Sequence, residues 1–388
     1  MRAFQVPLPT VLAGFVAVLV GYASSAAIIW QAADAAGADA QQIAGWLTML
    51  GIGMGISTLA LTLWYRAPVL TAWSTPGAAL LATSLHGSTL NEAVGIFIFA
   101  SALTLVCGAS GLFARLMRLI PHTLSAAMLA GILLRFGLDT FISLQGHFLL
   151  CGTMFISWLL AKACAPRYAV VVALIAGLVI SLLSGELKTE SVPLGIVMPA
   201  FTAPHFSLSS LLSIGLPFFL VTMTSQNAPG VATLKASGYN VPVSPLMVVT
   251  AVIALLLAPF GVFSICIAAI TAAICQGAEA HPDPAKRWLA AAAAGVFYLL
   301  AGIFGGSISA LLTALPLAFI HTLAGLALLS TIAGSLHQAL SHERERDAAI
   351  VTFLVTASGL TLAGIGSAFW GLIAGGVCYG LFSLTRRA

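Results

Sequence analysis

The sequence predicts an all-α polytopic membrane protein, and three observations carry this prediction. Hydrophobic residues make up 60% of the 388 residues, and charged residues only 7%. Uncharged segments recur along the whole chain, many of them close to the roughly 20 apolar residues that an α-helix needs to cross a bilayer. A water-soluble domain could not cover its surface with so few charges. Transmembrane segments must therefore account for nearly all of the chain.

Hydropathy and helix-breaking residues divide the chain into fourteen predicted segments. The N-terminal stretch MRAFQVPLPTVLAGF is not expected to be a cleaved signal peptide, because it has two early prolines and no small-residue cleavage site. The predicted segments are 8–30, 41–64, 68–85, 91–111, 121–141, 147–163, 167–184, 207–227, 243–260, 262–276, 287–305, 315–336, 347–363 and 365–384.

The distribution of lysine and arginine predicts that both ends of the chain are cytoplasmic. With the N-terminus inside, Lys188 alone lies on the opposite face, and Arg135 lies within the fifth segment. This is a strong positive-inside bias, and the net charge of +4 reflects topology and predicts no nucleic-acid partner. The predicted cytoplasmic residues are Arg2, Arg66, Arg115, Arg118, Lys162, Arg167, Lys235, Lys286, Arg287, Arg344, Arg346, Arg386 and Arg387.

The cysteines show no CxxC spacing and lie in apolar segments. We interpret them as buried thiols rather than disulfides or metal ligands, and we expect no metal and no other cofactor. They are Cys107, Cys151, Cys164, Cys266, Cys275 and Cys378.

The two halves of the chain resemble each other at a shift of about half its length. The stretch LIPHTLSAAMLAGILL (119–134) corresponds to ALPLAFIHTLAGLALL (314–329), and a similar shift pairs Gly37 with Gly238. Since seven is an odd number of segments, the second copy enters the membrane with reversed polarity. The sequence predicts a 7+7 inverted repeat, an architecture typical of secondary transporters. The predicted halves are residues 1–190 and 191–388.

The third segment, RAPVLTAWSTPGAALLATSLHG, contains its own interruption. Val69 to Trp73 suits an extended chain, Pro76 pushes Thr75 out of the α region, and Pro76 itself suits the first turn of a new helix. Ser74 or Thr75 can cap that helix. The half-helix would direct several free N–H groups into the protein, which suits a carboxylate. The alternative is a packed helix that the proline merely kinks.

The counterpart in the second half is the stretch APFGVFSICIAAITAAICQ (258–276). Pro259 and Gly261 end the ninth segment, Val262 to Cys266 suits an extended chain, and IAAITAAI begins a helix too short to cross alone. Short extended breaks and half-helices in segments three and ten would face each other and form a central site.

The eighth segment holds the densest polar cluster in an apolar setting, from Thr224 to Asn227. Polar side chains in a bilayer are costly unless they are satisfied, so the cluster marks either a substrate path or a helix contact. The first segment offers Tyr22, Ser24, Ser25 and Gln31 at the related place.

Several stretches together resemble the BenE family of benzoate:proton symporters. They are GYASSAAIIWQAA, YRAPVLTAWSTPGAALL, TSQNAPGVATLKASGY, IAAITAAIC and AHPDPAKRW, and they span nearly the whole chain. The resemblance implies the fold of the uracil:proton symporters and of the nucleobase and sulfate carriers. In that fold, segments 1–4 and 8–11 form a core domain that moves like an elevator against a gate domain of segments 5–7 and 12–14. We also expect a bacterial inner-membrane location and a homodimer through the gate domain.

One departure from the related carriers affects proton coupling. The nucleobase carriers use a glutamate in the eighth segment where this chain has Gln226, and a neutral amide cannot pick up a proton at physiological pH. Glu92, Asp139 and His321 are therefore the candidate proton carriers. A further alternative is that benzoate binds or releases its own proton.

The resemblance implies a secondary active transporter that imports benzoate, or a similar aromatic or apolar monocarboxylate, together with protons. The alternatives are a nucleobase or inorganic-anion transporter and, less favoured, a channel. An enzyme is not expected, because no paired carboxylates, metal cluster or Ser/His/Asp set converges in the apolar segments.

In this interpretation, the half-helix near Pro76 holds the substrate carboxylate. Gln226 and Asn227 orient it, while Tyr22, Trp73 and Phe263 contact the ring. The whole predicted substrate site is Tyr22, Ser24, Ser25, Trp73, Ser74, Thr75, Pro76, Gly77, Ser225, Gln226, Asn227, Phe263, Ser264 and Cys266.

Overall fold

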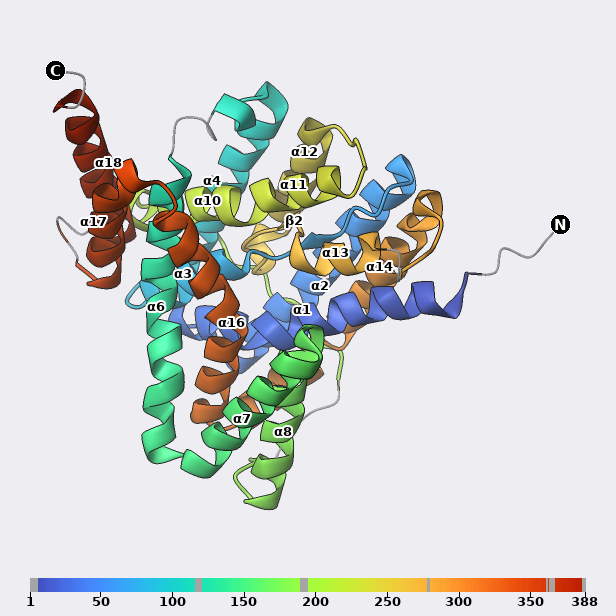
Figure 1. The fold of residues 1–388 in the computed structure, drawn as a ribbon. Helices are drawn as coiled ribbons and strands as arrows, with labels where there is room; N and C mark the ends of the chain where they lie inside the picture. The colour runs from blue at the N-terminus through green and yellow to red at the C-terminus, as the bar shows by residue number, and fades with distance from the viewer. Residues whose placement is uncertain are drawn as a thin grey trace.

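The fold is a bundle of α-helices around two very short strands (Figure 1). A computed structural model describes residues 6–115, 121–188, 195–277, 280–360, 362 and 367–385. Four of the basic residues used to predict topology, Arg2, Arg118, Arg386 and Arg387, lie outside these residues. The predicted class, a largely helical polytopic membrane protein, is confirmed.

The first half of the chain contains seven α-helices, one 3₁₀ helix (Pro166–Tyr168) and one strand in the described residues. The α-helices and the strand are α1 (Leu8–Ala35), α2 (Ala40–Tyr65), β1 (Thr71–Ala72), α3 (Thr75–Ser84), α4 (Leu90–Ser110), α6 (His122–Gly146), α7 (Phe148–Cys164) and α8 (Ala169–Leu183).

The second half begins with a long helix that is interrupted by two π-helical turns. It comprises α9 (Leu208–Ser210), a π-helical turn (Leu211–Gly215), α10 (Leu216–Thr222), a second π-helical turn (Met223–Asn227) and α11 (Ala228–Ala236). The remaining elements are α12 (Val243–Leu257), β2 (Cys266–Ile267), α13 (Ile270–Gln276), α14 (Trp288–Ile303), α15 (Gly305–Ala314), α16 (Leu317–Ala339), α17 (Arg346–Ala357) and α18 (Ser367–Thr385).

Within the described residues, eight helices are long and apolar enough to cross a membrane, or nine if the bent pair α15 and α16 is one span. The eight coincide with predicted segments 1, 2, 4, 5, 8, 9, 11 and 14. Segments three and ten each contain a short strand, β1 or β2, followed by a half-helix, α3 or α13, as their breaks predicted. Predicted segments 6, 7 and 13 hold shorter helices: α7 with 17 residues, α8 with 15 and α17 with 12. Segment 12 holds α16, which has 23 residues and belongs to the bent pair. Fourteen spans therefore stays a prediction.

Several boundaries differ from the sequence prediction. The eighth segment was predicted to end at residue 227, but its helix continues through α11 to Ala236. Helix α1 continues to Ala35 instead of ending near residue 30, because the run of small residues after Trp30 is buried and contains no breaker before Gly37. The predicted connection between segments 11 and 12 contains the helix α15, which meets α16 at 114° beside Pro316. Hydropathy did not reveal α15 as a separate element, because its composition continues that of its neighbours.

Local sequence signals explain where several helices begin and end. Asp39 with Gln42 and Thr89 with Glu92 form capping boxes that start α2 and α4. The paired glycines Gly37 and Gly238 both adopt a left-handed backbone (φ 78° and 89°) just after a helix, where glycine costs least. In both turns the next residue donates its N–H to a carbonyl five residues earlier.

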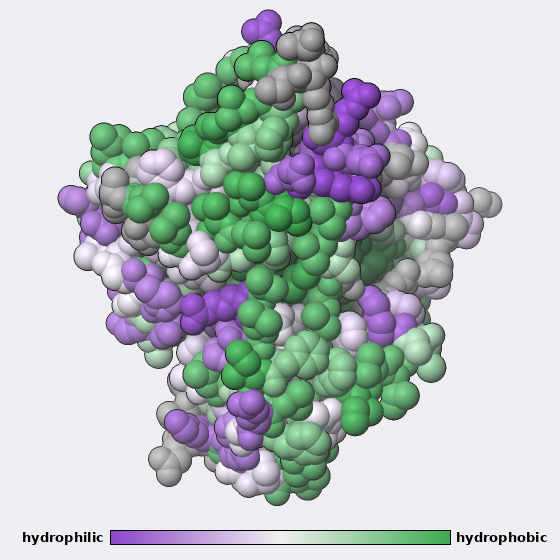
Figure 2. Space-filling model, turned by 60° about the vertical axis from the view of Figure 1, so that its left-hand side comes forward, coloured by the Kyte–Doolittle hydropathy of each residue, from purple (hydrophilic) through white to green (hydrophobic). Residues whose placement is uncertain are grey.

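The helices pack most extensively in two sets. In one set α2 packs on α14, α4 on α12, and α1 on α14 and α3. In the other set α6 packs on α16 and α17, α17 on α18, and α7 on α8. In the space-filling view, hydrophobic side chains cover much of the outer face and hydrophilic ones gather in separate patches (Figure 2). Such an exterior suits a hydrocarbon environment.

The cysteines are less uniform than predicted. Four of them are buried, whereas Cys378 is half-buried and Cys164, at the end of α7, is exposed. The apolar run around Cys164 suggested burial, but residues 162–166 at this end of α7 are all exposed.

Candidate functional site

The two predicted breaks meet at the centre of the molecule. Strand β1 pairs with β2 in antiparallel fashion, with Thr71 opposite Ile267 and Ala72 opposite Cys266. The ladder is extended by the Ala268 N–H, which donates to the Leu70 carbonyl at 2.9 Å. The backbone N–H and C=O groups that lack helical partners in one break form hydrogen bonds with those in the other break. The polar backbone of the two breaks is therefore not exposed to lipid.

Side chains from the surrounding helices hold the two strands. The Thr71 hydroxyl lies 2.7 Å from that of Ser57 and 2.8 Å from that of Thr58, both on α2. On the other strand, the Ile267 N–H donates to Oδ1 of Asn227 at 3.0 Å. Asn227 is thus engaged in fixing β2.

Ser74 caps helix α3, one of the two caps predicted for it. Its hydroxyl oxygen accepts from the Gly77 N–H at 3.0 Å and from the Thr222 hydroxyl at 3.2 Å. Pro76 has no N–H, and the Ala78 N–H donates to the Ser74 carbonyl. The N-terminus of α3 therefore offers fewer free N–H groups than the sequence suggested, since Thr75 alone among these first residues keeps an N–H unpartnered within the described part of the chain.

A cavity of about 530 Å³ lies beside the start of α3. Its aromatic wall consists of Tyr22 and Trp73, whose rings meet edge to face at 4.7 Å between centroids, and of Tyr298, whose ring lies 6.5 Å from that of Tyr22. Of the predicted site, the structure brings eight residues to this cavity: Tyr22, Ser24, Ser25, Trp73, Thr75, Pro76, Ser225 and Gln226.

Some polar side chains that line the cavity already form hydrogen bonds within the protein, and others do not. The Trp73 indole N–H donates to the Ser25 hydroxyl at 3.0 Å, and both Ser24 and Ser25 donate to the Gly21 carbonyl. By contrast, the side chains of Ser225 and Gln226 have no hydrogen-bond partner within the described residues. Neutral donors and acceptors therefore remain available to a ligand beside the aromatic wall.

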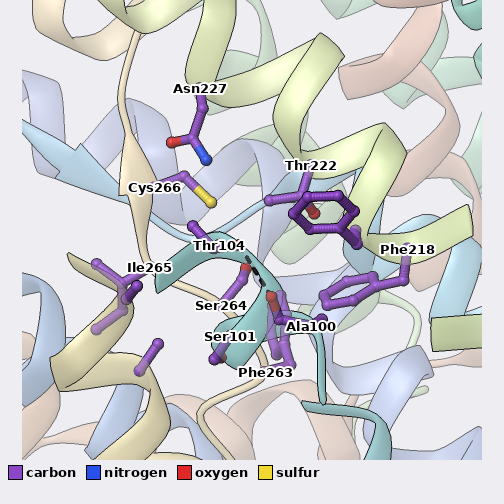
Figure 3. Close-up of a pocket in the computed structure, with 13 residues that line it drawn as sticks. Ala100, Ser101, Thr104, Phe218, Thr222, Asn227, Phe263, Ser264, Ile265 and Cys266 are labelled. Carbon is purple, nitrogen blue, oxygen red and sulfur yellow. Dashed lines mark hydrogen bonds between the residues drawn. The ribbon is translucent and has the colours of Figure 1, made fainter. Parts of the chain in front are cut away.

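The other predicted residues lie away from this cavity. Asn227, Phe263, Ser264 and Cys266 line a second, nearly filled pocket of about 10 Å³ between β2 and α4, together with Ser101 and Thr104 (Figure 3). Phe263 packs there against Phe97 and Phe218, with ring centroids 6.2 and 6.4 Å apart. Ser74 and Gly77 are buried at the start of α3 and are not among the described residues that line the cavity.

The three proton-carrier candidates also lie elsewhere. Glu92 belongs to the capping box of α4 and approaches His205 to 4.0 Å. Asp139 lies 3.9 Å from Arg135 on the exposed side of α6, and the half-buried His321 lies near the start of α16. The described lining of the large cavity includes no aspartate, glutamate or histidine.

Three polar residues that the sequence did not assign to the substrate site also line the cavity: Lys162, Thr271 and Tyr298. Tyr298 comes from α14 and Lys162 from the end of α7, far from the breaks in the chain. No motif marks them, because only the packing of these helices brings them to α1 and α3.

Comparisons with known proteins identify the family of this chain. Residues 4–381 match the family model described as benzoate membrane transport protein, BenE. The chain is 66% identical to the inner membrane protein YdcO of Escherichia coli (strain K12), over 99% of this chain and 98% of that one. It is 38% identical to a benzoate membrane transport protein of Acinetobacter baylyi, over 96% and 94% of the two chains.

Solved structures of transporters share the fold at low sequence identity. The transmembrane domain of the cyanobacterial bicarbonate transporter BicA aligns with a TM-score of 0.63 at 16% identity, covering 96% of this chain and 98% of that one. The murine anion transporter Slc26a9 in its inward-facing state aligns with a TM-score of 0.60 at 13% identity, covering 100% and 70%. The sequence matches and the fold together show that this chain, a multi-span membrane protein, belongs to the BenE family of benzoate membrane transport proteins.

Proposed function

We propose that the protein is a secondary active transporter that takes up benzoate, or a similar aromatic monocarboxylate, together with protons. The observation that carries this proposal is the cavity beside α3. It combines an aromatic wall with neutral polar side chains that have no hydrogen-bond partner within the described residues. An aromatic carboxylate needs both, since its ring gains from apolar contact and its anionic group must keep its hydrogen bonds. Tyr22 and Trp73 would contact the ring, and Gln226, Ser225 and the Thr75 N–H would bind the carboxylate.

The 7+7 inverted repeat and the elevator-like displacement belong to the same proposal. The pairing of β1 with β2, the half-helices α3 and α13, and the matching turns at Gly37 and Gly238 support the repeat. The two helix sets support a core domain of segments 1–4 and 8–11 and a gate domain of segments 5–7 and 12–14. We further propose cytoplasmic termini and a homodimer through the gate domain.

For proton coupling, we favour transfer through the substrate's own carboxyl group. Glu92, Asp139 and His321 stay candidates, but each lies away from the cavity. A substrate that binds as the neutral acid on the outside and releases its anion and its proton on the inside would couple the two fluxes without a protein carboxylate.

Uptake of radiolabelled benzoate into proteoliposomes tests the transport proposal. Benzoic acid also crosses lipid unaided, so the informative quantity is the saturable component, measured with and without an inward proton gradient. Liposomes without protein and liposomes with a Gln226→Ala variant are the controls. A proton-dependent, saturable component in the wild type alone supports the proposal, and its absence together with absent benzoate binding refutes it.

The main alternative is a nucleobase or inorganic-anion transporter of the same fold. The similarity to an anion transporter and a bicarbonate transporter favours testing it, although at 13–16% identity these relatives share the fold alone. Competition of uracil, sulfate and bicarbonate against bound benzoate decides between the two. Flux that fails to saturate with any of these solutes would instead indicate a channel.

A further inference from the structure

The cavity has two walls of different origin. The core helices supply Trp73, Thr75, Ser225 and Gln226, all of them neutral. The opposite wall comes from α7, α8 and α16 of the other helix set, and includes Lys162. Among the described residues that line the cavity, Lys162 carries the one formal charge at neutral pH.

Two local features keep the Lys162 ammonium near the cavity. Its Nζ lies 5.9 Å from the ring centroid of Trp158, one turn earlier on α7, within the range of a cation–π interaction. Lys162 also lies in the last turn of α7, where a cation complements the partial negative charge of the helix end. The buried Trp158 ring therefore helps to hold the Lys162 side chain at the exposed end of the helix.

We propose that Lys162 is the charge-selecting residue of the cavity: its ammonium group attracts the substrate carboxylate from the gate-side wall. Since the proposed topology puts Lys162 on the cytoplasmic side, it strengthens binding only while the cavity opens on that side. This inference rests on the proposed function. The neutral amide and hydroxyl groups of the core wall can hydrogen-bond a carboxylate or a neutral amide alike, whereas an ammonium group attracts only the anion.

The position of Lys162 on the gate side has a consequence for transport. If the core domain carries the substrate away from the gate, the carboxylate keeps Gln226 and Ser225 but leaves Lys162 behind. A group that contacts the substrate in one conformation only changes the relative affinity of the two conformations. Lys162 should therefore make the affinity higher on the cytoplasmic side than on the outer side.

Binding to the purified full-length protein tests charge selection. We compare benzoate with its neutral analogue benzamide in the wild type, Lys162→Gln and Lys162→Arg. Lys286→Gln is the matched control, because Lys286 is another exposed lysine but does not line the cavity. The expected result is a weakening of benzoate binding by about three- to tenfold in K162Q alone, with benzamide binding unchanged and most affinity retained in K162R.

Chemical restoration of the charge separates its effect from misfolding. In a Lys162→Cys, Cys164→Ser protein, the cationic reagent MTSEA should restore benzoate affinity, and the anionic reagent MTSES should lower it further. In oriented proteoliposomes, K162Q should raise the half-saturating benzoate concentration on the cytoplasmic side more than on the outer side.

The outcomes separate this inference from the proposed function. If the wild type binds benzoate and K162Q matches K286Q, or if benzamide binding falls equally, the role of Lys162 is overturned while the transport proposal stands. If MTSEA and MTSES act alike, charge selection is likewise overturned. If the wild type binds no benzoate, the proposed function fails and this inference fails with it.

Discussion

Replacing Ser74 by alanine should destabilise the protein by removing the link between α3 and α10. Ser74 is completely buried, caps α3 by accepting from the Gly77 N–H, and also accepts from the Thr222 hydroxyl. Loss of an N-cap costs about 1 kcal/mol. A buried hydroxyl left without its partner costs a further amount of about 1–3 kcal/mol.

The lower end of that range applies, because the Thr222 hydroxyl can turn to a backbone carbonyl one turn earlier in its own helix. We therefore expect Ser74→Ala to lower the free energy of unfolding by about 2 kcal/mol. Equilibrium unfolding in mixed micelles with increasing SDS measures it.

The matched control is Ser110→Ala. Ser110 is exposed, and within the described residues its hydroxyl donates to the Val106 carbonyl of its own helix alone. Its loss should change the free energy of unfolding by less than about 0.5 kcal/mol. If Ser74→Ala and Ser110→Ala are indistinguishable, the cap and the Thr222 contact do not stabilise the break, and the reasoning is refuted.

Three further predictions follow from the packing of the site. Gln226→Ala should weaken benzoate binding about tenfold through loss of one hydrogen bond to a charged group, without changing stability, which calorimetric titration and SDS unfolding together check. Asn227→Ala should instead lower the free energy of unfolding by about 1–3 kcal/mol, because the Ile267 N–H loses its acceptor. Benzoate affinity falling without any loss of stability would contradict this assignment. Gly325→Ala should destabilise α16 by about 1–3 kcal/mol, since a Cβ would overlap the Thr140 hydroxyl and lie 2.5 Å from the Phe136 carbonyl oxygen. Gly334→Ala in the same helix has open space around the new Cβ and should be neutral or slightly stabilising, so equal effects would refute the predicted overlap.

Local sequence features predicted much of the scaffold. Apolar length and composition identified the long helices, because only a helix satisfies its own backbone in a bilayer. The WSTP stretch predicted an extended break followed by a capped helix, and Ser74 does cap α3. These features depend on neighbouring residues alone, which is why they could be read from the chain.

The identity of the cavity lining depended on tertiary structure. Neighbouring residues Gln226 and Asn227 were predicted to act together, yet Gln226 faces the cavity and Asn227 binds β2. They lie in a π-helical turn, whose wider winding changes the direction of each side chain relative to an α-helix. Hydropathy cannot show this change.

The same limit applies to the aromatic and charged residues. Phe263 was expected at the substrate ring, but the pairing of β1 with β2 places it among Phe97 and Phe218 instead. Tyr298 and Lys162 reach the cavity from α14 and α7, and nothing in their local sequence indicates it. The sequence by itself determined the environment, the helices and the breaks, because these follow from short-range chemistry. Only the packing of distant helices decided which side chains share the cavity, because that depends on how each helix is rotated against its neighbours.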